Sequence, residues 1–262
     1  MRTLLGDLAD LILPGTCAGC GADRTRLLHG ACSVCVAELE ALRPYRTAPS
    51  PPPPGFPPCV AVGPYGGALR GALLAYKEKG RHRLAGPLGA LLAGAAAEIA
   101  PPGQPIVIIP VPSTRAARRE RYGDHMIRLT RHAVRRLRAA GWPARVEQPL
   151  RALPRPDSTS LDAAGRSAAA VNSLRINPAR IGNPRRGGAM RGTLMVVDDI
   201  VTTGATLAAA VRRLEEADMQ VTGAAVLAAT RLRRNCPPPL SAVNPRCADR
   251  GEGQPSGIPN QG

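Results

Sequence analysis

Aromatic side chains are nearly missing from this 262-residue chain, which has one tryptophan, one phenylalanine and four tyrosines. Hydrophobic residues still make up 44% of it, and many of them are alanine. We therefore expect an aliphatic, closely packed core. Proteins that bind single-stranded nucleic acid by stacking bases use aromatic side chains as platforms. The scarcity of rings counts against that mode of binding.

Long hydrophobic runs are missing too, since no stretch approaches the ~18 consecutive apolar residues that a membrane-spanning helix needs. The apolar N-terminus is interrupted by Asp7 and Asp10, and a signal peptide would not carry acids there. Its spacing favours a short amphipathic helix that packs on the body of the protein. We expect a cytoplasmic protein without membrane insertion, whose cysteines are reduced or metal-bound.

Lysine is also rare: the chain has only Lys77 and Lys79. Arginine therefore supplies almost all of the positive charge. The chain has 35 Lys and Arg against 19 Asp and Glu, a formal net charge of +16. Codon bias of a GC-rich genome explains arginine in place of lysine, but it does not explain an excess of this size. The excess favours a polyanionic partner, either a phosphorylated metabolite or a nucleic acid.

Composition divides the chain into three regions. Residues 1–54 hold four of the seven cysteines and end in a proline run at 49–54, which reads as a linker. Residues 55–231 alternate apolar runs typical of strands with helical stretches, which predicts an α/β domain with a parallel sheet flanked by helices. Residues 232–262 are rich in Pro, Gly, Asn and Arg without periodicity and are expected to be a disordered tail.

The element boundaries follow from periodicity within the middle region. Strands are predicted at residues 59–62, 106–109, 194–197 and 222–228, and helices at residues 84–99, 126–139 and 207–217.

The strongest functional signal is the segment 194–206, Leu-Met-Val-Val-Asp-Asp-Ile-Val-Thr-Thr-Gly-Ala-Thr. An apolar strand leads into two carboxylates, Asp198 and Asp199, then into a small, hydroxylated turn before a helix. Ligands bind at the carboxyl ends of strands in open α/β sheets, and backbone N–H groups at a helix N-terminus bind phosphate. The segment lacks the Gly-Lys-Ser/Thr ending of a triphosphate-binding P-loop. The alternative is an ordinary strand-to-helix turn with Thr206 as the helix cap.

Segment 196–206 resembles the phosphoribosyl-pyrophosphate signature of type I phosphoribosyltransferases. The resemblance covers most of residues 17–230 and narrows to the ComF family of amidophosphoribosyltransferase-like competence proteins. It is carried by the two Cys-x-x-Cys motifs, Tyr76-Lys77 followed by Gly80, Pro110-Val-Pro-Ser-Thr-Arg115, Arg118-Arg-Glu-Arg121, residues 157–174 and the signature itself.

This resemblance implies a type I phosphoribosyltransferase fold, with sites assigned by motif. The two acids would be the catalytic pair that accepts the ribose hydroxyls. The 5-phosphate would be bound by the signature turn, namely by Val201, Thr202, Thr203, Gly204, Ala205 and Thr206. Lys77 becomes a candidate pocket cation, and a solvated charge cluster is the alternative for it.

The turn that ends the strand at 106–109 is the second ligand loop implied by the resemblance. Ser113, Thr114 and Arg115 would donate to pyrophosphate, with Mg²⁺ bridging pyrophosphate and ribose oxygens. The alternative is a proline-stiffened turn that merely ends the strand. In similar enzymes a mobile loop closes over the diphosphate, and Arg118, Arg119 and Arg121 are the candidates for that clamp.

The chain departs from the family after this clamp. Family members usually continue Arg-Gly-aromatic with an amide-bearing residue next, whereas this chain has Arg121-Tyr-Gly-Asp-His125. His125 is then either a polar residue at a helix start or a general base. Further arginines at helical spacings form either a solvated helix face or a nucleic-acid footprint, namely Arg128, Arg131, Arg135, Arg136 and Arg138.

Two Cys-x-x-Cys pairs near the N-terminus, Cys17/Cys20 and Cys32/Cys35, have the form of zinc knuckles. Each pair can supply two sulfur ligands to a metal ion, and the two pairs together complete the tetrahedral coordination of one ion. The motifs therefore predict a structural Zn²⁺ in a zinc-ribbon segment. Four thiolates leave no open position for catalysis. A redox dithiol is the alternative.

Two functions remain open. The first is an enzyme that binds phosphoribosyl pyrophosphate and Mg²⁺ and transfers ribose 5-phosphate to an unknown acceptor. The second is a non-catalytic accessory of DNA uptake, because ComF relatives are associated with natural competence; its partners would be single-stranded DNA and competence proteins.

Overall fold

A six-stranded mixed sheet forms the centre of the computed structural model, which describes residues 15–23, 26–120, 123–153, 173–177 and 192–230. The strand order is β3-β4-β10-β9-β5-β6. The strands are β3 (Tyr45–Thr47), β4 (Cys59–Pro64), β5 (Ile106–Pro110), β6 (Ala144–Val146), β9 (Thr193–Val201) and β10 (Gly223–Ala229). Every pair is parallel except β3 with β4. The predicted α/β fold with a largely parallel sheet is confirmed.

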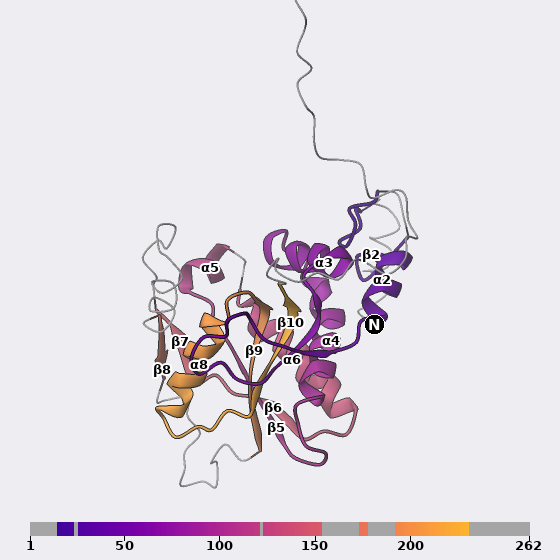
Figure 1. Ribbon diagram of the computed structural model, residues 1–262. Helices are drawn as coiled ribbons and strands as arrows, with labels where there is room; N and C mark the ends of the chain where they lie inside the picture. The colour runs from indigo at the N-terminus through magenta and orange to yellow at the C-terminus, as the bar shows by residue number, and fades with distance from the viewer. Residues whose placement is uncertain (1–14, 24–25, 121–122, 154–172, 178–191, 231–262) are drawn as a thin grey trace, which may run out of the picture. The chain divides into compact units, whose positions relative to one another are not determined.

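Helices cover both faces of this sheet (Figure 1). One face carries α4 (Ala85–Ala97) and α6 (His125–Ala139), and the other carries α8 (Ala205–Glu215). The antiparallel pair of β7 (Leu150–Ala152) and β8 (Leu174–Ile176) also packs against α8. Strands buried on both faces read as continuous apolar runs, and β5 and β10 are buried along their whole length.

Small residues let the helices pack closely where rings are missing. A methyl group at Gly89 of α4 would lie 2.5 Å from the Cβ atom of His132 in α6, so the two helices cross in close contact at this glycine. Alanines such as Ala93 and Ala133 are fully or almost fully buried in the same layer. The expected aliphatic, closely packed core is therefore what the structure contains.

The predicted strands and helices are present, with shifted ends. The largest correction concerns β9, which continues through Asp198 and Asp199 to Val201 instead of ending at residue 197. Its pairing with β10 persists to Val201, opposite Ala229, and this ladder keeps the two acids in extended backbone. Helix α8 begins at Ala205, and its N-cap is Gly204, so Thr206 lies inside the helix and does not cap it.

Helix α3 (Gly67–Glu78), which carries Lys77, was not among the predicted helices. Its buried residues Ala68, Leu69, Ala72, Leu73 and Tyr76 follow a helical spacing. That spacing was available in the sequence, but two glycines in the first turns obscure it.

The two ends of segment 49–57 pack on the domain, whereas Pro51, Pro52 and Pro54 between them are exposed. Pro49 and Pro57 are buried and Phe56 contacts the core beneath α8. Strand β3 lies before the run and is hydrogen-bonded to β4. The sheet therefore includes a strand from ahead of the boundary expected at residue 54.

The first described residues form a small unit with the four cysteines. It consists of β1 (Leu27–Leu28), β2 (Ala31–Cys32) and α2 (Ser33–Glu40). The predicted N-terminal helix, the clamp residue Arg121, the family-like segment 157–172 and the predicted tail 232–262 lie outside the described residues. Within the described part of the chain, no helix is both long and apolar enough to cross a membrane.

Candidate functional site

The signature turn joins β9 to α8 at the carboxyl edge of the sheet. Thr202 and Thr203 are exposed there, and Gly204 has a left-handed backbone with φ of 75°. The first turn of an α-helix leaves backbone N–H groups without intrahelical partners, and such groups bind anions. The turn therefore offers hydroxyl and amide donors together in the place where the sequence predicted the 5-phosphate.

Gly204 also accommodates the proline run. A methyl group at this position would lie 2.7 Å from the Phe56 ring and 2.8 Å from Pro49. Both the positive φ and this close contact require glycine. The N-terminal part of the chain thus forms a wall of the signature turn, a relation that no local pattern indicated.

Asp198 and Asp199 point to opposite faces of the sheet, because side chains alternate along a strand. Val196 belongs to the core beneath α8, and Val197 to the core beneath α4 and α6. Asp198 accordingly lies on the α8 side, where its charge, after burial, helps to raise the pKa of the Cys59 thiol to about 12. Asp199 lies on the side of α3 and α6. The two acids were expected to act as a pair, yet they have different surroundings.

Asp199 is buried and has two cationic or polar partners on one oxygen. Its Oδ2 atom lies 2.8 Å from Lys77 Nζ and 2.9 Å from His125 Nε2. Burial by itself would raise the pKa of Asp199, but the His125 hydrogen bond and the Lys77 charge lower it to about 2. The carboxylate is therefore ionised at neutral pH. Lys77, the candidate pocket cation, is bound to Asp199 and is not part of a solvated charge cluster.

His125 joins the two ligand loops that the sequence predicted. It is the first residue of α6, follows the N-cap Asp124 and is buried. While its Nε2 atom faces Asp199, its Nδ1 atom lies 3.4 Å from Ser113 Oγ in the turn after β5. Tyr76 donates a 2.7 Å hydrogen bond to the His125 carbonyl oxygen and holds the start of α6 in place. In the sequence, only two features drew attention to His125: the departure from the motif that the resemblance implies, and the helix-capping Asp124 just before it.

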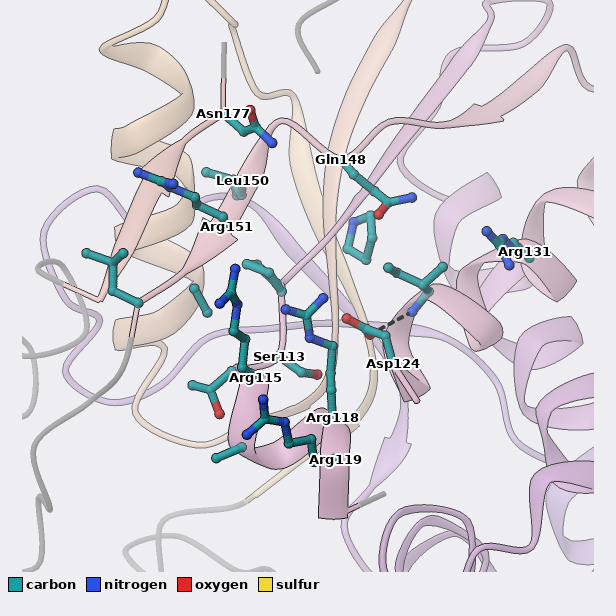
Figure 2. A pocket seen from close by; sticks show the side chains of 17 residues that line it. Ser113, Arg115, Arg118, Arg119, Asp124, Arg131, Gln148, Leu150, Arg151 and Asn177 are labelled. Atoms are coloured by element: carbon teal, nitrogen blue, oxygen red, sulfur yellow. Dashed lines mark hydrogen bonds between the residues drawn. The ribbon is translucent and has the colours of Figure 1, made fainter. Parts of the chain in front are cut away.

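An arginine-rich cavity of about 1000 Å³ opens beside the turn after β5 (Figure 2). Ser113 and Thr114 line it together with Arg115, Arg118 and Arg119, which belong to or begin helix α5 (Arg115–Glu120). Further lining residues include Arg131 of α6 and Arg151 of β7. Of the described residues, those of the signature turn at 201–206 do not line this cavity. The predicted pyrophosphate residues thus share one cavity, while the signature turn lies outside it.

The charge of this cavity is strongly positive. Five arginines line it against a single acid, Asp124, whose carboxylate accepts a hydrogen bond from Ile127 N at the start of α6. Within the described part of the chain, none of these arginines has a carboxylate within 4.0 Å. Arginine forks bind phosphate oxygens in pairs, so the cavity is chemically suited to a polyphosphate.

The four N-terminal cysteines come together as the spacing predicted. The sulfur atoms of Cys17, Cys20, Cys32 and Cys35 all lie within 4.8 Å of one another. The backbone N–H of Cys32 donates to Cys17 Sγ at 3.2 Å, an arrangement that stabilises a thiolate. Four sulfur donors at this separation fit a tetrahedral Zn²⁺ site. Among the residues that the structure describes, this is the only set of three or more metal-donor side chains close enough to hold an ion.

This cysteine unit is docked on α3. A methyl group at Gly71 of α3 would lie 1.9 Å from the Gly19 carbonyl oxygen, so helix and knuckle meet at their backbones. Glu38 of α2 accepts a 2.9 Å hydrogen bond from Ala68 N at the start of α3. The Arg81 side chain donates to the Thr16 carbonyl and hydroxyl oxygens. The unit therefore supports the helix that delivers Lys77 to Asp199.

A comparison with models of known protein families found a match for the part of the chain that contains the signature turn. Residues 186–240 match the family model described as the phosphoribosyl transferase domain, which takes in β9, the signature turn, α8 and β10. This part of the chain is phosphoribosyltransferase-like. No curated protein matches the sequence. The phosphoribosyltransferase-like region thus contains Asp198, Asp199 and the threonine turn, while the turn at 110–115 and the cysteine unit lie outside the matched segment.

Proposed function

We propose that the protein binds phosphoribosyl pyrophosphate with Mg²⁺ and transfers ribose 5-phosphate to an acceptor, as a ComF-type phosphoribosyltransferase with a structural zinc. The observation that carries the proposal is the exposed threonine turn with its left-handed glycine at the end of β9, within the segment that matches the phosphoribosyl transferase domain. Thr202 and Thr203 would donate to the 5-phosphate, together with the backbone at the start of α8.

The transfer needs charge to be positioned rather than a protein nucleophile. The bond between ribose C1 and the pyrophosphate oxygen breaks, pyrophosphate leaves with the electron pair, and the acceptor bonds to C1 and loses a proton. Asp198 would accept from the ribose hydroxyls, and Asp199 would orient Lys77 and His125. Ser113, Thr114 and Arg115 would hold the departing diphosphate, with Arg118 and Arg119 neutralising its charge.

Mg²⁺ would reach this site with the ligand. When bound, the ion would neutralise negative charge on the diphosphate. The side-chain oxygens near the signature do not form a three-donor cation site among the described residues. Its ligands would therefore come mainly from the substrate and water.

Calorimetric titration of the zinc-loaded protein with phosphoribosyl pyrophosphate and Mg²⁺ tests this proposal. The double variant Thr202→Ala/Thr203→Ala should weaken binding at least about tenfold, about 1.4 kcal/mol, because two exposed phosphate donors are lost. Thr222→Ala is the matched control, since Thr222 is also exposed but precedes β10 at the opposite edge of the sheet. Wild-type affinity in the threonine double variant, or no binding by the wild type, would contradict the proposal.

A second candidate function is single-stranded DNA handling in competence, and the arginine face of α6 favours it. Arg131, Arg135, Arg136 and Arg138 are all exposed on this one helix. Each phosphate contact contributes about 0.7 to the salt dependence of single-strand binding. Arg131→Glu/Arg135→Glu should therefore weaken oligonucleotide binding and lower that slope by more than 1, measured by fluorescence anisotropy. The control variant is Arg43→Glu/Arg46→Glu, which changes the net charge by the same amount at a site outside α6. If both double variants weaken oligonucleotide binding equally, α6 is not the nucleic-acid-binding surface.

A further inference from the structure

A continuous chain of polar contacts runs from the pyrophosphate turn to helix α3. Ser113 Oγ lies 3.4 Å from His125 Nδ1, His125 Nε2 lies 2.9 Å from Asp199 Oδ2, and that same oxygen lies 2.8 Å from Lys77 Nζ. Of these four residues, only Ser113 also lines the arginine-rich cavity. Of the four residues, Ser113 is therefore the one through which a change at the buried imidazole can reach a ligand in this cavity by direct contact.

The proton on His125 decides what that hydroxyl can do. Asp199 is ionised and accepts at Nε2, so the neutral imidazole carries its proton on Nε2 and presents Nδ1 as an acceptor. The Ser113 proton then points toward His125, and only lone pairs face the cavity. When His125 takes up a proton, Nδ1–H donates to Ser113 Oγ, and the Ser113 proton is released to donate to an anion.

The surrounding charges support such a proton uptake on ligand binding. Asp199 of β9 faces the imidazole directly, and the α6 residues Asp124 and Arg128 lie close enough to Tyr76, the ring beside His125, to affect its pKa. Lys77 of α3 opposes an imidazolium, although its charge is balanced by Asp199. A diphosphate at Ser113 adds negative charge on the other side of the ring. Negative charge there favours the protonated imidazole.

We propose that His125 is a positioning residue that takes up a proton when diphosphate binds, and so turns the Ser113 hydroxyl from His125 toward the ligand. The inference rests on the proposed function in one respect, because it takes the Ser113 turn as the diphosphate site. Glutamine is the matched substitution, because it is uncharged, polar and close to histidine in size.

The test is titration of inorganic diphosphate with Mg²⁺ between pH 6 and pH 8.5, for the wild type, His125→Gln and Ser113→Ala. The diphosphate itself titrates, but it does so identically with all three proteins. Wild-type affinity should rise as the pH falls more steeply than in either variant, by up to about tenfold per pH unit for one linked proton. Imidazole NMR gives a second readout: the signal missing from His125→Gln should shift toward the imidazolium form when diphosphate is added at constant pH.

Each outcome separates this inference from the proposed function. A steeper wild-type pH dependence together with the imidazolium signal supports proton-linked positioning. Parallel pH dependences in all three proteins, or an imidazole signal that does not shift when diphosphate is added, would overturn the inference and leave the diphosphate site standing. If the wild type binds no diphosphate at any pH, both the site and the inference fail.

Discussion

Replacing Asp199 with alanine is expected to lower the free energy of unfolding by about 3–5 kcal/mol, because the change leaves the largely enclosed ammonium group of Lys77 without its partner. Lys77 Nζ and His125 Nε2 both depend on the same carboxylate oxygen. Urea denaturation, followed by circular dichroism, measures the loss. Since the side chains of Lys77 and Asp199 are only 19% and 11% exposed, solvent screens this pair little.

Two further variants show whether the ion pair is the cause. Asp199→Ala/Lys77→Met should recover part of the lost stability, because the uncompensated ammonium group is removed as well. Asp198→Ala is the matched control at the preceding residue. Because the Asp198 side chain is only half-buried, this change should lower the free energy of unfolding less than Asp199→Ala does. Equal losses for Asp198→Ala and Asp199→Ala, or no recovery in the double variant, would show that the pair does not hold this site together.

The same contacts make stability depend on acid pH. The pKa of Asp199 is lowered to about 2 from an ordinary value of 3.8, with burial opposing the shift and His125 and Lys77 causing it. A carboxyl group with a lowered pKa stabilises the folded state above its unfolded pKa. Its contribution should therefore be complete above about pH 4 and disappear as the pH falls toward 2. Asp199→Asn should lack this part of the acid dependence.

Loss of the metal is expected to have the second large effect. The purified protein should contain one zinc per chain, and Cys32→Ser should lose it and leave the cysteine unit without its main support, because so small a unit has little core of its own. A ligand at 1000 times its Kd stabilises the state that binds it by about 4.1 kcal/mol. Metal analysis and thermal unfolding in the presence of a strong chelator measure both effects.

The control for this prediction is Cys59→Ala. Cys59 is buried in the sheet, and burial is the main reason that its pKa rises to about 12, so it is a structural thiol outside the cluster. The variant should keep its zinc. Full zinc content in Cys32→Ser, or unchanged unfolding after chelation, would contradict a metal bound by the four cysteines.

Helix α3 should report on the metal through its contacts with the cysteine unit. Gly71 touches the Gly19 backbone, and Glu38 accepts from the first turn of the helix. After zinc removal, amide exchange should speed up in the first half of α3 as well as in residues 17–40. Because Lys77 lies at the end of this helix, the metal also supports the position of Asp199.

Local patterns in the sequence determined much of this architecture. The apolar run before Asp198 predicted a buried strand, the small residues after it predicted a turn, and the next periodic stretch predicted α8. The two Cys-x-x-Cys pairs predicted a four-sulfur cluster because short spacings allow few other arrangements. These signals depend on neighbours within a few residues.

Only the tertiary structure decided how the site is connected. Alternation along a strand separates Asp198 from Asp199, but it does not say that Lys77 and His125, which lie far away in the sequence, meet at Asp199. Likewise, a proline run predicts the absence of regular structure, but not that Phe56 packs against Gly204. Periodicity fixes which face a side chain occupies, while its partners depend on the order of strands and the packing of helices across the sheet.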